Sequence, residues 1–203
     1  MQFVRLLLWM AVAVALFVLG AIASGGISFR GEPLTAGSDL EPGAPLGGAF
    51  SLVNHRGEPV TEEIFRERPS VTLFGFTHCP DVCPTGLMEM TRWAEELGPD
   101  ADKLNLIFVT VDPERDTPET MRDYVSGFSD RIVGVSGKPE DVHAMVKDYK
   151  IYSRKVVLEG GDYTMDHTAQ MILQDAEGNF IGTIAPDEAD ETAMAKLRKL
   201  VAG

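Results

Sequence analysis

The residues best suited to chemistry are the two cysteines of the chain, Cys79 and Cys83, which are separated by Pro80-Asp81-Val82. They lie between an apolar run at residues 71–76 and a helical pattern at residues 85–97, so both thiols are expected at a helix N-terminus. Unpaired backbone amides and the helix dipole favour the thiolate form there. An offset of four residues would place both sulfurs on one helix face, whereas thioredoxin-type redox motifs have two intervening residues. The spacing therefore suits a shared ligand.

The best third ligand among the four histidines is His167, in the segment YTMDHTAQ. It comes just before a predicted strand, at a sheet edge where the strand-helix loops of such a fold can gather. Two thiolates and one imidazole form a soft site for Cu(I) that could also engage Cu(II), whereas zinc would need a fourth ligand. Met165 shares a strand face with His167 if the segment is extended, and a thioether is a soft donor, but methionine more often fills a core.

The other histidines are weaker candidates. His55 lies in a predicted hairpin turn and His143 on a predicted exposed helix face, so both are interpreted as surface residues. His78 adjoins the first cysteine and stays a candidate. Asp81, between the cysteines, and Asp112, after the second buried strand, could orient ligands from an outer shell, but they equally suit a turn residue and a loop cap.

Three other interpretations of the cysteine pair stay open. The two thiols could form a local disulfide bond, although a structural disulfide in an exported protein normally joins distant segments. They could cycle between dithiol and disulfide as a thiol-disulfide reductase, which gives His167 no necessary role. A peroxidase would be expected to carry Thr or Ser three residues before its reactive cysteine, and these positions are Phe76 and Pro80.

The surrounding pattern predicts an α/β domain. Strand-helix alternation followed by a hairpin and a last helix indicates a mixed sheet covered by helices on both faces, in the order of the thioredoxin architecture with inserted elements. Expected strands cover residues 71–76, 104–111, 132–135, 156–158, 169–174 and 179–184, after a first hairpin around Arg56-Gly57. Expected helices cover residues 85–97, 117–128, 139–149 and 188–201. Residues 136–139 are expected to cap the third of these helices.

The N-terminal segment predicts export. Residues 4–23 are nearly all apolar, and roughly 20 such residues can span a bilayer as one transmembrane helix. The positive charges of Arg5, at the start of this run, and of the amino terminus keep the N-terminus in the cytoplasm, although Ala21-Ile22-Ala23 also resembles a signal-peptide cleavage site. We expect a membrane anchor at 1–23, a flexible linker at 24–48 and a domain at 49–203. A bacterial inner-membrane protein with its domain in the periplasm fits best.

Composition excludes one class of partner. The formal net charge is -13, and the acidic residues are spread along the domain. This distribution argues against nucleic acid as a partner.

Three segments together carry a family resemblance. FGFTHCPDVCPTGL, FVTVDPERDTPE and YTMDHTAQMIL, in this order and spacing, resemble the SCO (SenC) family of copper chaperones for cytochrome c oxidase assembly. The resemblance covers roughly residues 47–180. It implies a thioredoxin-like fold and copper ligands at Cys79, Cys83 and His167.

The resemblance also implies partners. A family member would receive copper from an upstream periplasmic donor and deliver it to the copper A centre of cytochrome c oxidase subunit II. The same cysteines could instead reduce the acceptor's cysteines before metal loading, or sense copper or redox state. The chain is accordingly expected to be a metallochaperone rather than an enzyme.

Overall fold

The computed structural model describes residues 9–10, 40–66 and 68–203. The predicted membrane anchor and the linker up to residue 39 lie outside this part of the chain, apart from Trp9 and Met10. Among the described residues, no helix combines the length and apolar character that crossing a membrane requires.

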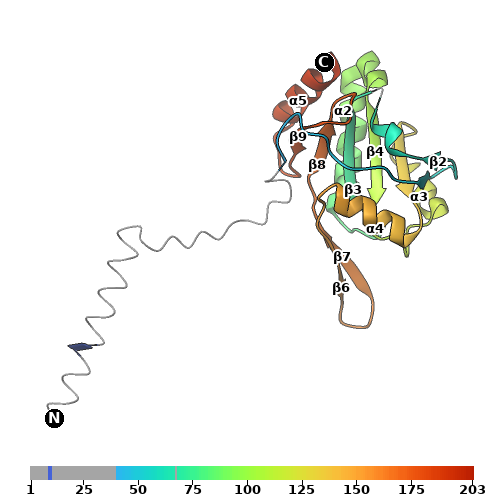
Figure 1. Ribbon diagram of the computed structural model, residues 1–203, viewed down its shortest axis with the longest axis vertical. Helices are drawn as coiled ribbons and strands as arrows, with labels where there is room; N and C mark the ends of the chain where they lie inside the picture. The colour runs from blue at the N-terminus through green and yellow to red at the C-terminus, as the bar shows by residue number, and fades with distance from the viewer. Residues whose placement is uncertain (1–8, 11–39, 67) are drawn as a thin grey trace, which may run out of the picture. The chain divides into compact units, whose positions relative to one another are not determined.

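A mixed sheet forms the centre of the domain (Figure 1). Its seven strands run in the order β2-β1-β5-β4-β3-β8-β9, with β3, β4 and β5 parallel and with β1, β8 and β9 antiparallel to their neighbours. The strands are β1 (Leu52–Asn54), β2 (Pro59–Val60), β3 (Ser70–Gly75), β4 (Asn105–Thr110), β5 (Ile132–Ser136), β8 (Met171–Gln174) and β9 (Phe180–Ile184). The central parallel strands are apolar runs because both of their faces are covered.

Helices flank this sheet, as the sequence predicted for a thioredoxin-like fold (Figure 1). They are α2 (Val82–Leu97), α3 (Pro118–Val125), α4 (Pro139–Asp148) and α5 (Asp190–Ala202), with 3₁₀ turns at Glu62–Phe65 and Gly98–Lys103. The predicted cap of α3 is confirmed, since the Thr117 side chain accepts a hydrogen bond from the Thr120 amide. The predicted cap of α4 is wrong at Ser136, which belongs to β5; Lys138 precedes the helix without a side-chain cap bond.

A second, two-stranded sheet stands apart from the first, and we call it the ribbon. It pairs β6 (Ser153–Val157) with β7 (Tyr163–His167), and it projects from the domain beyond the ends of the main strands (Figure 1). The sequence predicted a short strand at residues 156–158 and none at β7. The reason is that YTMDH alternates weakly and carries no apolar run, so its pairing depends on β6 rather than on burial.

The last part of the predicted linker packs on the domain. The Gly43 amide donates to the Phe180 carbonyl at 2.7 Å, and the Phe180 amide donates to the Ala44 carbonyl at 2.8 Å. Leu46 is buried in the core. The ordered contacts of the domain therefore begin before the boundary predicted at Ala49.

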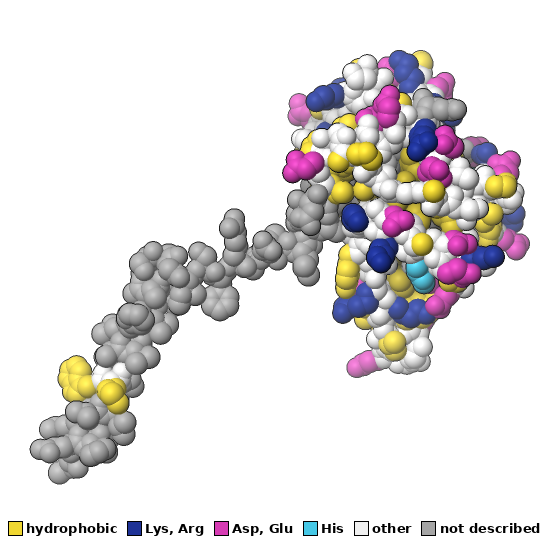
Figure 2. Space-filling view, in the orientation of Figure 1, with side chains coloured by type: hydrophobic (Ala, Val, Ile, Leu, Met, Phe, Trp, Pro, Cys, Tyr) yellow, Lys and Arg dark blue, Asp and Glu magenta, His cyan; other side chains and the backbone are white. Residues whose placement is uncertain are grey.

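Charged side chains of both signs lie on the surface of the domain. On the face drawn in Figure 2, acidic side chains are interspersed with Lys and Arg.

Candidate metal centre

The two cysteines lie in a turn between β3 and α2, residues 76–83, which we call the cysteine turn. The Cys79 amide donates to the Phe76 carbonyl at 3.2 Å, which closes the turn, and α2 begins at Val82. Cys83 is therefore in the first turn of the helix, whereas Cys79 precedes it. The prediction that one helix face presents both sulfurs is wrong; the turn brings them together.

The structure places His167 beside the two cysteines. One ligand atom from each of Cys79, Cys83 and His167 lies within 4.8 Å of the others, and Cys83 Sγ is 3.8 Å from His167 Nε2. His167 is the last residue of β7, and it also precedes β8, which begins at Met171, as the sequence predicted. Cys83 is 0% exposed and Cys79 is 9% exposed, so the group is largely shielded from solvent. Both thiols are free.

The imidazole of His167 is oriented by its own neighbour. Its Nδ1 lies 2.8 Å from the Thr168 carbonyl oxygen. Because a carbonyl only accepts hydrogen bonds, Nδ1 carries the proton, and the lone pair of Nε2 faces the sulfurs. The Phe76 ring packs edge-on against the imidazole, with ring centroids 5.7 Å apart. A ring held in this way presents one nitrogen to a metal ion.

The two thiols differ in acidity. A hydrogen bond from the Cys83 thiol lowers the pKa of Cys79 to about 4. Burial opposes this shift, and the Asp81 amide adds to it. The same hydrogen bond, together with burial, raises the pKa of Cys83. The metal-free pair is thus one thiolate and one thiol, and a metal ion that binds both sulfurs must displace one proton.

Glycine at position 75 permits the close packing of Cys83. A Cβ at Gly75 would lie 2.6 Å from Cys83 Sγ and 2.8 Å from Phe108 Cε2. Both distances are shorter than real Cβ contacts, so any side chain here would displace the sulfur. The glycine in the buried run VTLFGF is therefore part of the site.

A buried carboxylate that the sequence analysis missed holds the cysteine turn. Asp116 accepts hydrogen bonds from the Thr77 amide at 3.1 Å, from Thr77 Oγ1 at 2.6 Å and from Thr110 Oγ1 at 2.7 Å. It thereby ties the start of the turn to the end of β4. Burial raises the pKa of Asp116, and the three hydrogen bonds oppose that shift. In the segment DPERDTP, nothing local distinguishes this aspartate from its neighbours.

The two predicted outer-shell aspartates have different environments. Asp112 is buried; it lies 2.5 Å from Arg115 Nε and accepts a hydrogen bond from the Tyr163 hydroxyl at 2.9 Å. Asp81 is exposed, and its side chain forms no capping bond with α2. Its amide, rather than its carboxylate, reaches the sulfur of Cys79.

The other histidines stand outside this group. His143 is exposed, as predicted, and His78 is also exposed, with its Nδ1 3.1 Å from Thr77 Oγ1. The prediction that His55 is a surface residue is wrong. His55 is buried, and its Nδ1 accepts a hydrogen bond from the Gly134 amide at 3.0 Å, because the hairpin turn docks on β5. Burial lowers the pKa of His55.

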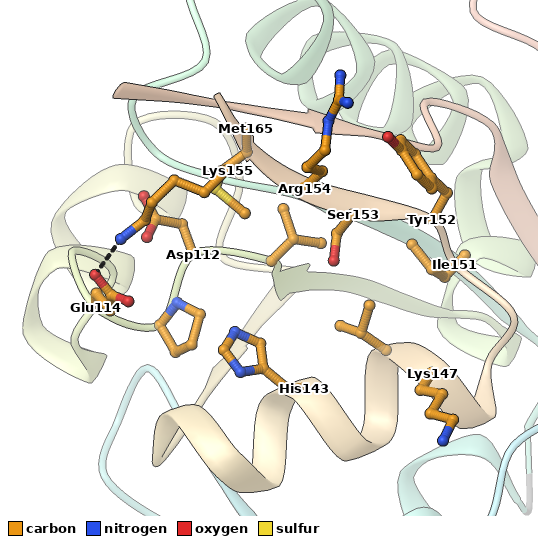
Figure 3. A pocket seen from close by; sticks show the side chains of 13 residues that line it. Asp112, Glu114, His143, Lys147, Ile151, Tyr152, Ser153, Arg154, Lys155 and Met165 are labelled. Carbon is orange, nitrogen blue, oxygen red and sulfur yellow. Dashed lines mark hydrogen bonds and ion pairs between the residues drawn. The ribbon is translucent and has the colours of Figure 1, made fainter. Parts of the chain in front are cut away.

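Met165 faces a different space from His167. It lines an open cavity of about 600 Å³ between α4 and the ribbon, together with Asp112, Glu114 and His143 (Figure 3). Its thioether packs against the core. The common role of methionine as an apolar filler therefore describes it well.

The arrangement suits a soft metal ion with few ligands. Two sulfurs and one imidazole nitrogen converge, and among the described residues no acidic oxygen completes a four-ligand group. Cu(I) accepts such a donor set, whereas structural zinc sites have four protein ligands.

Known proteins resemble this chain in sequence and in fold. The SCO1/SenC family model matches residues 38–202. Protein SCO2, mitochondrial, of Saccharomyces cerevisiae is 36% identical over 159 residues, which are 77% of this chain and 53% of that protein. This chain therefore spans about half the length of that relative.

Two solved structures extend the comparison. Copper-bound ScoI of Bradyrhizobium japonicum is 43% identical, with a TM-score of 0.71 over 76% of this chain and 99% of that chain. Copper-bound ScoI of Arabidopsis thaliana is 31% identical, with a TM-score of 0.72 over 77% of this chain and 98% of that chain. The family match, the fold and the Cys-Cys-His group agree, and this chain belongs to the SCO1/SenC family.

Proposed function

We propose that this chain is a copper carrier that binds one copper ion through Cys79, Cys83 and His167. The observation that carries the proposal is the convergence of their three ligand atoms within 4.8 Å, with Nε2 of the imidazole free to coordinate. Two solved relatives are described as copper-bound, and the SCO (SenC) resemblance assigns the same three residues as ligands. Asp112 and Asp81 complete the proposal as residues of the outer shell.

Delivery is the second part of the proposal. The chain would be held in a bacterial inner membrane by residues 1–23, receive copper from a periplasmic donor, and load the copper A centre of cytochrome c oxidase subunit II. A three-ligand site leaves a position for an incoming thiolate before a donor ligand leaves. Cys79, at 9% exposure, is less enclosed than Cys83, at 0%, so the exchange would begin at Cys79.

One observation favours a second function, thiol-disulfide exchange. The pKa of Cys79 is lowered to about 4, and Cys83 lies beside it as a resolving thiol. A low-pKa, accessible thiol with a neighbouring partner is the arrangement of a redox pair. In that role the chain would reduce the two acceptor cysteines before copper loading, and its own pair would become a disulfide.

Copper affinity separates the two functions. The full-length chain in detergent would be reduced and titrated with Cu(I) against a chromogenic chelator, in parallel with Cys83→Ser and His167→Ala. We expect each variant to bind at least tenfold more weakly, which corresponds to about 1.4 kcal/mol. His143→Ala, which changes an exposed histidine outside the group, is the matched control and should bind like the parent.

The outcome that would favour the reductase is specific. It is a His167→Ala variant that binds Cu(I) like the parent while the cysteine pair exchanges rapidly with an oxidised acceptor. Delivery would be tested by mixing the copper-loaded chain with the reduced soluble domain of subunit II. Copper A absorption should then appear without added copper.

A further inference from the structure

The ribbon needs anchors to hold His167 in place. A two-stranded sheet alone is at best marginally stable in water, and no residue of β6 or β7 is fully buried. At its base, the Thr168 amide donates to the Tyr152 carbonyl at 3.0 Å, and the Tyr152 amide donates to Thr168 Oγ1 at 3.1 Å. Further contacts come from the loop between β4 and α3.

Arg115 in that loop contacts the opposite end of β7. Its Nη1 donates to the Tyr163 carbonyl at 3.0 Å, and its guanidinium carbon stands 3.7 Å from the centroid of the Tyr163 ring. Asp112 joins both residues: its carboxylate pairs with Arg115 Nε at 2.5 Å and accepts a hydrogen bond from the Tyr163 hydroxyl at 2.9 Å. Nearby, Glu114 and Lys155 also join the loop to the ribbon (Figure 3).

Arg115 reaches the imidazole from a second side. Its guanidinium carbon lies 5.9 Å from the centroid of the Phe76 ring. That ring packs edge-on against His167 at 5.7 Å, with the ring planes at 89°. One side chain therefore stands against both the start of the strand that carries His167 and the ring that packs on its imidazole.

The energetics of the Asp112–Arg115 pair indicate that it fixes the position of the ribbon rather than adding stability. Asp112 is 2% exposed and Arg115 is 18% exposed, so forming the pair requires removing most water from both charges. A buried ion pair adds little net stability compared with apolar residues of the same volume. Arg115 Nη2 is also buried without a hydrogen-bond partner among the described residues, which adds a further cost.

We propose that Arg115 is a positioning residue, which with Asp112 and Tyr163 sets the place of His167 relative to the two sulfurs. This inference rests on the proposed copper site and assigns its alignment to residues that do not touch the metal. The third ligand would then stand in place before copper arrives, so that binding need not order the ribbon.

A double-mutant cycle tests whether Arg115 acts through His167. Cu(I) affinity would be measured on the full-length chain for Arg115→Met, His167→Ala and the double variant. We expect Arg115→Met to weaken binding about tenfold in the parent, as loss of an outer-shell partner does. In the His167→Ala background it should weaken binding less than about twofold, because the ligand that it positions is absent.

A spectroscopic readout and two further variants complete the test. The thiolate-to-Cu(II) absorption band and the nitrogen hyperfine signal should change in Arg115→Met. Tyr163→Phe removes one hydrogen bond and should shift both readouts less, in the same direction, even if Arg115→Met folds poorly. Arg154→Met is the control, since Arg154 lies on the same ribbon in an exposed pair with Asp166, and it should match the parent.

Two results would overturn this inference and leave the proposed copper site standing. One is that Arg115→Met lowers the Cu(I) affinity equally in the parent and in His167→Ala. The other is that Arg115→Met and Tyr163→Phe leave both affinity and spectra unchanged. A parent chain that binds no copper would overturn the proposed site, and the inference with it.

Discussion

The cysteine turn and the ribbon meet at one site but are built differently. The cysteine turn joins a central strand to a helix, and Cys83 on it is completely buried. The ribbon pairs with no strand of the main sheet, and Val157 near its tip is 73% exposed. The two sulfurs are thus fixed by the core, whereas the imidazole is fixed by the Phe76 ring and by the contacts of the ribbon with the loop that carries Arg115.

This difference suits the proposed function, in which the chain both holds and releases a copper ion. Local opening has a low free energy where few apolar contacts are buried, and the ribbon is such a region. Moving the ribbon would withdraw the proposed ligand His167 and leave the two sulfurs in place. Variants that disturb either half on its own can test whether the two halves differ in this way.

The largest effect is expected from Gly75→Ala in the core behind the cysteine turn. The new Cβ would overlap Cys83 Sγ and Phe108, and overpacking of a core costs about 1–3 kcal/mol. Urea unfolding should show this loss, and Cu(I) affinity should fall because the sulfur moves. Gly48→Ala is the control, since its Cβ would meet an exposed Asp148 oxygen at 3.2 Å that can move away. Equal stabilities for the two variants would show that the cysteine turn is not rigidly packed against the core.

Asp116→Asn should give the next largest effect. Asparagine has one fewer acceptor for the Thr77 and Thr110 donors, and a buried unsatisfied group costs about 1–3 kcal/mol. Urea unfolding of the parent, of Asp116→Asn and of the exposed control Asp123→Asn measures the loss. A variant as stable as the control would show that the carboxylate does not hold the turn.

The pH dependence of the same pair of variants has a defined sign. Because burial raises the pKa of Asp116 above its ordinary 3.8, the folded chain binds this proton more tightly than the unfolded chain. The stability of the parent relative to Asp116→Asn should therefore fall as pH rises from 3.8 through the raised pKa. A difference that grows with pH over this range would contradict the assigned direction.

Hydrogen exchange should detect the more easily opened half directly. Without copper, the amides of β7 should exchange faster than those of β3. Copper should raise the free energy of opening of β7 by the amount that His167 adds to copper binding, about 1.4 kcal/mol for a tenfold effect, and exchange there should slow accordingly. In His167→Ala this gain at β7 should vanish, while β3 keeps its copper-dependent protection through the sulfurs. If copper still protects β7 from exchange in His167→Ala, the protection does not come from His167.

The smallest effect is expected from Lys155→Met. Its ion pair with Glu114 at 2.5 Å is exposed, so water and salt screen it and its contribution to stability is small, and smaller at high salt. Urea unfolding at low and high salt measures it. A loss larger than that of Asp116→Asn would show that the ribbon is anchored mainly by its exposed contacts.

Local patterns predicted most of the main sheet and its helices. Apolar runs marked β3 and β4, and the Thr117-Pro118 cap marked α3, because burial and capping leave a signature in a few adjacent residues. The ribbon strand β7 leaves no such signature. Its residues are half-exposed and owe their conformation to pairing with β6, for example between Ser153 and His167.

The site was predictable to the same degree. The spacing of the cysteines indicated a pair at a strand-to-helix turn. The proposed third ligand, His167, is 84 residues from Cys83, and the family resemblance, more than the local pattern, pointed to it. Asp116 and the buried His55 were missed for one reason. Their roles depend on contacts with Thr77 and with the Gly134 amide, which lie far away in the sequence.

The contact of residues 43–46 with β9 has a consequence for solubility. As the last strand of the sheet, β9 would otherwise offer unpaired amides and carbonyls to a strand of another molecule. Gly43 and Ala44 satisfy the Phe180 backbone, and Pro45 beside Asn179 has no amide hydrogen with which to continue the ladder outward. A fragment that starts at Ala49 would uncover the Phe180 end of this edge and should associate with itself more readily than a fragment that starts before Gly43, which keeps that end covered.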